Sequence, residues 1–260
     1  MNNDLAGLSP EQLVINGSGY TLAGNALTNT TSGNFISASE SATINLQIAF
    51  NGANTGATVS AGKILTFAQP QAFGSAFGQY WTGGGTVTFN GNLTGSTGGM
   101  FRAENSTIVK VNGATNTFTS NFVGAESNAS FECHSSTCFG DNANRIYMGG
   151  GIVSIVGSYV FSNNFATSTS TPNLSKLTAD DDVSITGDGS VVDDLSIEQS
   201  STSKGIQFTG NTTLTGSVSV YGADTTSDVK FDSALSGAGN VTVESGKAWM
   251  SAPSNFTGTL

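Results

Sequence analysis

From Leu13 onward, apolar and polar residues alternate in short runs that Gly, Asn or Ser interrupt. The clearest runs are LVING, TINLQIAF, TVTFNG and TIVKVNG, and no long window has the spacing of an amphipathic helix. Period-two alternation between turn-forming residues is typical of half-buried β-strands. The pattern predicts an all-β body over residues 13–260. Residues 1–12 are expected to form an N-terminal cap or linker, in which Ser9 and Pro10 suit the start of a short helical turn.

Two strand patterns repeat together in the last third of the chain. VSITG (183–187), IQFTG (206–210) and VKFDS (229–233) start 23 residues apart, and LSIEQ (195–199), VSVYG (218–222) and VTVES (241–245) keep the same interval. A repeat of this length in an all-β chain is one coil, whose inward side is buried only when coils stack. We therefore expect a parallel β-solenoid, most often a right-handed β-helix, with Phe208 stacked on Phe231. An antiparallel β-sandwich is the alternative, because Gly-rich turns serve both folds.

Three segments interrupt the regular alternation. Residues 68–81 are rich in aromatic side chains, residues 121–145 hold both cysteines, and residues 166–182 contain a Ser/Thr-rich stretch followed by three aspartates. Insertions in a solenoid leave the coil at its turns and gather on one side. We expect these segments to be inserted loops that carry whatever is specific to this protein.

Composition narrows the possible partners. Only 10% of residues are charged, and 8 basic against 18 acidic residues give a net charge of −10. Because Lys and Arg do not cluster, binding to nucleic acid phosphates is not expected. The longest apolar run, residues 149–161, is too short and too broken for a membrane span. A signal peptide is not visible, and we expect Met1 to start inside a longer exported polypeptide.

Cys133, Cys138 and the only histidine, His134, fall within the stretch FECHSSTCFG. Two cysteines in an otherwise thiol-free, exported chain usually form a disulfide. A zinc site needs a second ligand pair, and a redox motif needs the spacing Cys-x-x-Cys, so neither fits. We expect a disulfide-pinned loop that displays His134 as part of a contact surface. No cofactor is expected.

Asp181, Asp182 and Asp188 are candidates for weak Ca²⁺ binding, because they fall close to one turn. Solvated turn carboxylates are the alternative interpretation. A polysaccharide lyase would also need a basic residue beside them, and Lys176 and Lys204 lie some distance away along the chain.

Phe73, Phe77, Tyr80 and Trp81 form the densest aromatic cluster in the sequence. Such a cluster is either an exposed contact platform, for example for stacking against carbohydrate, or a small core beneath an inserted loop.

The C-terminal stretch ALSGAGNVTVESGKAWMSAPSNFTGTL (234–260) resembles the passenger-associated repeat of bacterial autotransporters. The characteristic step is Asn255-Phe256-Thr257-Gly258, preceded by GAGNVTVESG. The resemblance implies a surface-displayed or secreted β-helical stalk of the kind found in adhesins and self-associating proteins.

These observations favour a non-enzymatic structural or adhesive module located outside the cell or on the bacterial outer surface. Its expected partner is a second copy, end to end or side by side, or a glycan or receptor on a host or biofilm surface. The alternative is a β-helical polysaccharide lyase or hydrolase, or a phage tailspike or fibre protein.

Overall fold

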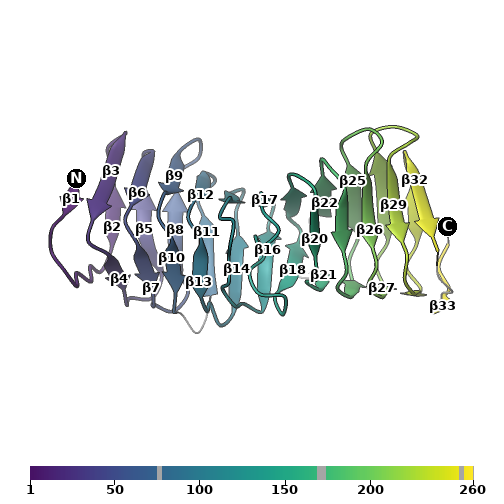
Figure 1. Cartoon of the computed structure of the whole chain (residues 1–260), viewed down its shortest axis with the longest axis horizontal. Coiled ribbons are helices and arrows are strands. Elements are labelled where there is room, and N and C mark those ends of the chain that lie inside the picture. Colours follow the sequence, from purple (N-terminus) through teal and green to yellow (C-terminus); the bar gives the residue numbers. More distant parts are fainter. Residues whose placement is uncertain (75–77, 169–173, 252–254, 260) are drawn as a thin grey trace.

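The chain forms an elongated rod whose N- and C-terminal ends lie at opposite ends of the long axis (Figure 1). The computed structural model describes residues 1–74, 78–168, 174–251 and 255–259. Within these ranges all regular structure is β, and no helix that could cross a membrane occurs among them. Each coil passes through three faces, here called the first, second and third face.

The first and second faces are twelve-stranded sheets. The first face contains β1 (Asn2–Asn3), β3 (Tyr20–Gly24), β6 (Ala42–Asn45), β9 (Ile64–Phe67), β12 (Thr86–Phe89), β15 (Ile108–Val111), β17 (Ser130–Cys133), β19 (Ile152–Ile155), β22 (Ser175–Ala179), β25 (Leu195–Gln199), β28 (Val218–Gly222) and β31 (Val241–Val243). The second face contains β2 (Leu13–Ile15), β5 (Asn34–Ala38), β8 (Thr55–Val59), β11 (Gly78–Thr82), β14 (Met100–Ala103), β16 (Phe122–Glu126), β18 (Arg145–Gly149), β21 (Phe165–Thr167), β24 (Gly189–Val191), β27 (Thr212–Leu214), β30 (Leu235–Gly237) and β33 (Asn255–Phe256).

The third face is divided into a four-stranded and a five-stranded sheet. The first of these contains β4 (Leu27–Asn29), β7 (Ile48–Phe50), β10 (Gln71–Phe73) and β13 (Leu93–Gly95). The second contains β20 (Tyr159–Phe161), β23 (Val183–Ile185), β26 (Gly205–Phe208), β29 (Asp228–Phe231) and β32 (Lys247–Met250). Between the two sheets, residues 112–121 and 134–144 cross the third face without a named strand.

The strand register confirms the predicted solenoid. Ile206 pairs with Val183 on one side and with Val229 on the other, and Val218 pairs with Leu195 and Val241. These are the 23-residue steps seen in the sequence. Every pairing between named strands in the described part of the chain is parallel, so the alternative of an antiparallel sandwich is wrong.

Aromatic side chains stacked one coil apart fill the interior. The rings of Phe208 and Phe231 are nearly parallel with centroids 5.2 Å apart, as the repeat predicted. Phe67 and Phe89 stack in the same way at 4.8 Å. All four side chains are at most 2% exposed. Because a parallel register places like residues above one another, each coil buries the apolar side chains of its neighbours.

Two of the three segments expected to be insertions are largely parts of coils. Residues 68–81 include β10 and β11, and residues 121–145 include β16, β17 and the start of β18. Residues 166–182 include the end of β21 and all of β22, and residues 169–173 of this segment lie outside the described ranges. At the N-terminus, β1 pairs with β3 and Leu8 forms a bridge with Leu27, so residues 1–12 lie along the first coil without a helix.

The Phe208–Phe231 stack allows a test of the core. We expect Phe208→Ala to lower the free energy of unfolding by about 3–5 kcal/mol, because it leaves a cavity between two coils. The matched control is Tyr221→Ala, which removes an aromatic ring that is 38% exposed and should change stability by less than about 0.5 kcal/mol. Urea unfolding followed by circular dichroism measures both, and equal losses would contradict the stacked core.

Candidate contact surfaces

The two cysteines form the predicted disulfide. Cys133 ends β17, and its Cα atom lies 5.5 Å from that of Cys138, within the range that disulfides adopt. The amide of Cys138 donates to the carbonyl of Ser135, so the bond closes one tight turn at the corner between the first and third faces.

This turn is part of the wall of the rod and is not a displayed loop, which corrects the expectation from the sequence. Cys133, Cys138 and Phe139 are fully buried. The Phe139 ring stacks on Phe131 with centroids 5.6 Å apart and meets Phe161 at 5.1 Å. The turn therefore fills the third face between the coil of Phe118 and β20, at a place where other coils have a strand.

His134 lies at the edge of that turn. Its Nε2 is 3.4 Å from a carboxylate oxygen of Glu132, which also pairs with Lys110 at 2.7 Å. Its backbone carbonyl accepts a hydrogen bond from the Tyr159 hydroxyl at 2.9 Å. The side chain is partly exposed, so its role in a contact surface stays a prediction.

The aromatic cluster does not form an exposed platform. Trp81 is fully buried and Phe73 is 3% exposed, and both belong to the central core. Tyr80 faces outward, where the guanidinium of Arg102 lies 4.9 Å from its ring centroid. Phe77 lies outside the described residues. The contact-platform prediction is therefore wrong for Phe73 and Trp81, because alternation along β10 and β11 turns them into the rod.

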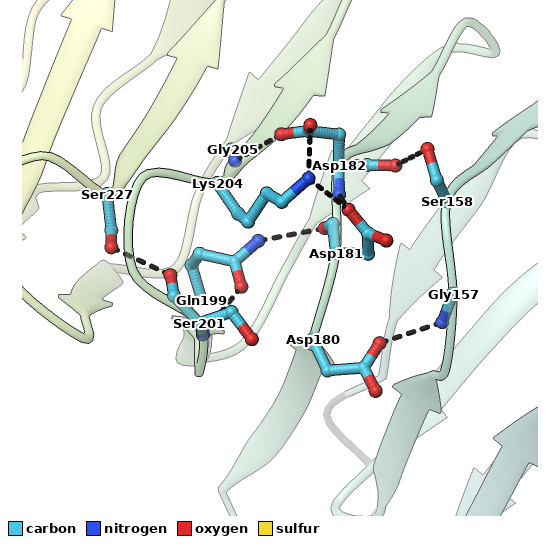
Figure 2. Close-up of polar contacts among 10 residues, drawn as sticks. All are labelled: Gly157, Ser158, Asp180, Asp181, Asp182, Gln199, Ser201, Lys204, Gly205 and Ser227. Carbon is cyan, nitrogen blue, oxygen red and sulfur yellow. Dashed lines mark hydrogen bonds and ion pairs between the residues drawn. The ribbon is translucent and has the colours of Figure 1, made fainter.

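Asp181 and Asp182 lie at a corner where Lys204 of the neighbouring coil pairs with both carboxylates. The ammonium of Lys204 is 2.7 Å from a carboxylate oxygen of Asp181 and 3.1 Å from one of Asp182 (Figure 2). The second Asp182 oxygen accepts from the amide of Gly205 at 2.9 Å. Asp188 does not join this group. It lies at the next corner, between β23 and β24, where its carboxylate accepts a hydrogen bond from the amide of Asn211. The three carboxylates thus form no shared Ca²⁺ site, and no metal-binding cluster occurs among the described residues.

The ion pair shifts the pKa of each partner in the direction that favours its charged form. The hydrogen bond from Lys204, followed by that from the Asp182 amide, lowers the pKa of Asp181. The carboxylates of Asp181 and Asp182 raise the pKa of Lys204. A catalytic base needs the opposite shift for a lysine, because only the neutral amine accepts a proton. At this corner the ion pair therefore favours the charged forms of Asp181 and Lys204.

A groove of about 420 Å³ lies beside this corner, over the strands of the third face. Its floor is made by outward side chains of β20, β23, β26 and β29, and one wall is made by the corners 200–204 and 223–227. These two corners are longer than the equivalent corners 156–158, 180–182 and 244–246 and extend beyond them at the upper edge of the rod (Figure 1). The groove therefore lies where two corners of the third face are longer than the others.

The first face carries a second surface, here called the threonine row. Its members point outward and lie in register on consecutive strands: Thr21, Thr43, Thr66 and Thr88. Ile64, which is 48% exposed, lines a shallow hollow of about 190 Å³ beside Thr43 and Thr66. The same register continues to Lys110 and Glu132, which are charged. The stretch from Thr21 to Thr88 is therefore uncharged. Sequence reasoning did not identify this row. Aligning the segments that start at Thr43, Thr66 and Thr88 with a shift of one coil would bring the threonines together.

The buried disulfide turn predicts a structural effect. We expect Cys133→Ala/Cys138→Ala to lower the free energy of unfolding by about 2 kcal/mol, since the bond restricts a short loop of the unfolded chain. Urea unfolding with and without a reductant measures this. Reductant should weaken the wild type and leave the variant unchanged. A variant as stable as the oxidised wild type would contradict a wall-forming turn.

The Lys204 ion pair predicts a pH effect with a definite sign. Because the folded pKa of Asp181 is lowered, its stabilising contribution is present above the unfolded pKa and is lost as the pH falls through the folded pKa. In Lys204→Met, the pKa of Asp181 should move up toward its usual value. Carboxyl titration by NMR measures the shift. The matched control is Lys176→Met, which removes the pair with Glu198 on the first face and should leave Asp181 unchanged.

Comparison of this chain with known protein families, with curated proteins and with solved structures finds no match. The parallel β-solenoid, which is consistent with a passenger-type β-helix, is established by the strand register.

Proposed function

We propose that this chain is a structural and adhesive module of a bacterial cell-surface or secreted protein, and that it acts by contact between copies. A rod of stacked coils repeats the same side-chain position at every step, so a weak contact made once is made many times. The resemblance of residues 234–260 to autotransporter passengers supports an extracellular or outer-surface location.

The threonine row is the observation that carries the proposal. A threonine hydroxyl both donates and accepts a hydrogen bond, and its methyl group is apolar, so two such rows on two copies are self-complementary. The same patch can then serve both partners of a two-fold contact. The net charge of −10 opposes association in general, and this uncharged strip is a place where two rods can approach.

A β-helical polysaccharide lyase or hydrolase is the alternative from a different class. It would place Lys204 as the base beside Asp181 and Asp182, which do lie within reach of it. The raised pKa of Lys204 and the lowered pKa of Asp181 argue against that role. A phage tailspike or fibre protein without catalysis would share the structural role proposed here.

The proposal predicts that purified wild-type rods associate side by side. In Thr43→Lys/Thr66→Lys/Thr88→Lys we expect isolated rods, because three ammonium groups per copy would face each other across the contact. Negative-stain electron microscopy and sedimentation velocity measure the change. Thr213→Lys/Ser236→Lys is the matched control, since it adds lysines to outward, in-register positions of the second face.

The control should leave the association intact. Wild-type rods that remain single would overturn the proposed contact. Filaments joined end to end that persist in the triple-lysine variant would also overturn it and would move the contact to the ends of the rod.

A further inference from the structure

The outward row of the third face in the C-terminal half combines polar and apolar side chains. In register across five strands lie Val160, Ser184, Gln207, Lys230 and Trp249. Val160 is 64% exposed and Trp249 is 52% exposed, so each end of the row offers an apolar surface. Between them, the polar members form the floor of the groove described above.

Hydrogen bonds join the two corners that form the wall of this groove. The Ser227 hydroxyl donates to the carbonyl of Ser201 at 2.9 Å, and the hydroxyls of Ser203 and Thr226 are 3.0 Å apart. Asp224 accepts from the hydroxyls and amides of Thr226 and Ser227, which lowers its pKa to about 2. A wall ordered before binding reduces the entropy that a ligand must overcome.

Each of the two lysines around the groove is paired with a carboxylate, and the carboxylates outnumber the lysines. Lys204 is paired with Asp181 and Asp182, and Lys230 with Asp228 at 3.1 Å. The amide of Gln207 donates to Asp232, which also accepts from the Ser251 hydroxyl at 2.6 Å. No lysine in this group lacks a carboxylate, and the whole chain is acidic, so a polyanionic ligand gains little here. A neutral ligand rich in hydroxyl groups suits these side chains, because the lysines donate hydrogen bonds, the aspartates accept them and Gln207 does both.

We propose that the groove binds a neutral oligosaccharide along the axis of the rod, with one sugar ring stacked on Trp249. Sugar rings present paired hydroxyls at their edges and an apolar C–H face. Gln207 and the ion pairs match the hydroxyls, whereas the indole of Trp249 matches the C–H face. Adjacent strands are about 4.8 Å apart, so the row from Val160 to Trp249 spans about 19 Å, enough for a short chain of sugars. This inference goes beyond the proposed contact between copies, since it concerns another face and a non-protein ligand.

Titration of the full chain with cellohexaose, maltohexaose, mannohexaose and chitohexaose tests the proposal. Trp249 is the exposed tryptophan and Trp81 is fully buried, so a change of intrinsic fluorescence reports on the end of the row that lies beside Lys230 of the groove. We expect saturable binding of at least one hexasaccharide with a micromolar to millimolar dissociation constant. By calorimetry, Trp249→Ala and Gln207→Ala should each weaken it by about tenfold or more.

Tyr221→Ala is the matched control, because it removes a partly exposed aromatic ring from the first face. It should bind as the wild type does, and melting curves of all three variants verify that they are folded. Absence of saturable binding to all four hexasaccharides would overturn the proposal. So would binding of heparin or hexagalacturonate alone, or binding that survives both groove substitutions. The triple-lysine variant of the threonine row should still bind sugar, which separates failure here from failure of the contact between copies.

Discussion

The in-register stacking of parallel coils is the constraint on which the rest of the structure depends. Each strand bonds to the equivalent strand one coil away, so a residue is placed beside its counterpart in the neighbouring coil. Phe208 meets Phe231 for this reason, and the same step aligns polar residues outside. A coil can change length only at its corners without breaking this ladder, and the long corners 200–204 and 223–227 form the wall of the groove.

The sequence predicts the architecture where the repeat is uniform. The 23-residue interval of the last coils predicts the parallel register and the Phe208–Phe231 stack. The N-terminal half is harder to interpret because its register shifts, as between Asn34 and Ile36 in the pairing of β5 with β8. Alternation over three or four residues does not identify the inward side. The sequence therefore leaves open whether Phe73 and Trp81 form an exposed platform or a packed core, and both belong to the core.

The cysteine turn shows a different limit. Close spacing of the two cysteines in a chain expected to be exported was enough to predict the bond between Cys133 and Cys138, because that inference depends on chemistry and on the expected compartment. Its burial depends on Phe139, which fits between Phe131 of the same coil and Phe161 of the next coil. The turn packs there because the third face has no strand in this coil. The sequence of the loop alone does not show that.

Distance along the sequence has a particular meaning in this fold. Lys204 seemed remote from Asp181 and Asp182, yet it lies 23 residues beyond Asp181 and is therefore its neighbour on the next coil. The same shift joins Thr43 to Thr66 and Gln207 to Lys230. Functional surfaces of such a rod are rows that run across coils, to which each coil contributes one side chain. Binding through a row is distributed over several weak contacts, which favours adhesion to repetitive partners such as another rod or a polysaccharide. At one such step, the ion pair of Lys204 lowers the pKa of Asp181 and raises that of the lysine, which favours the charged form of each group.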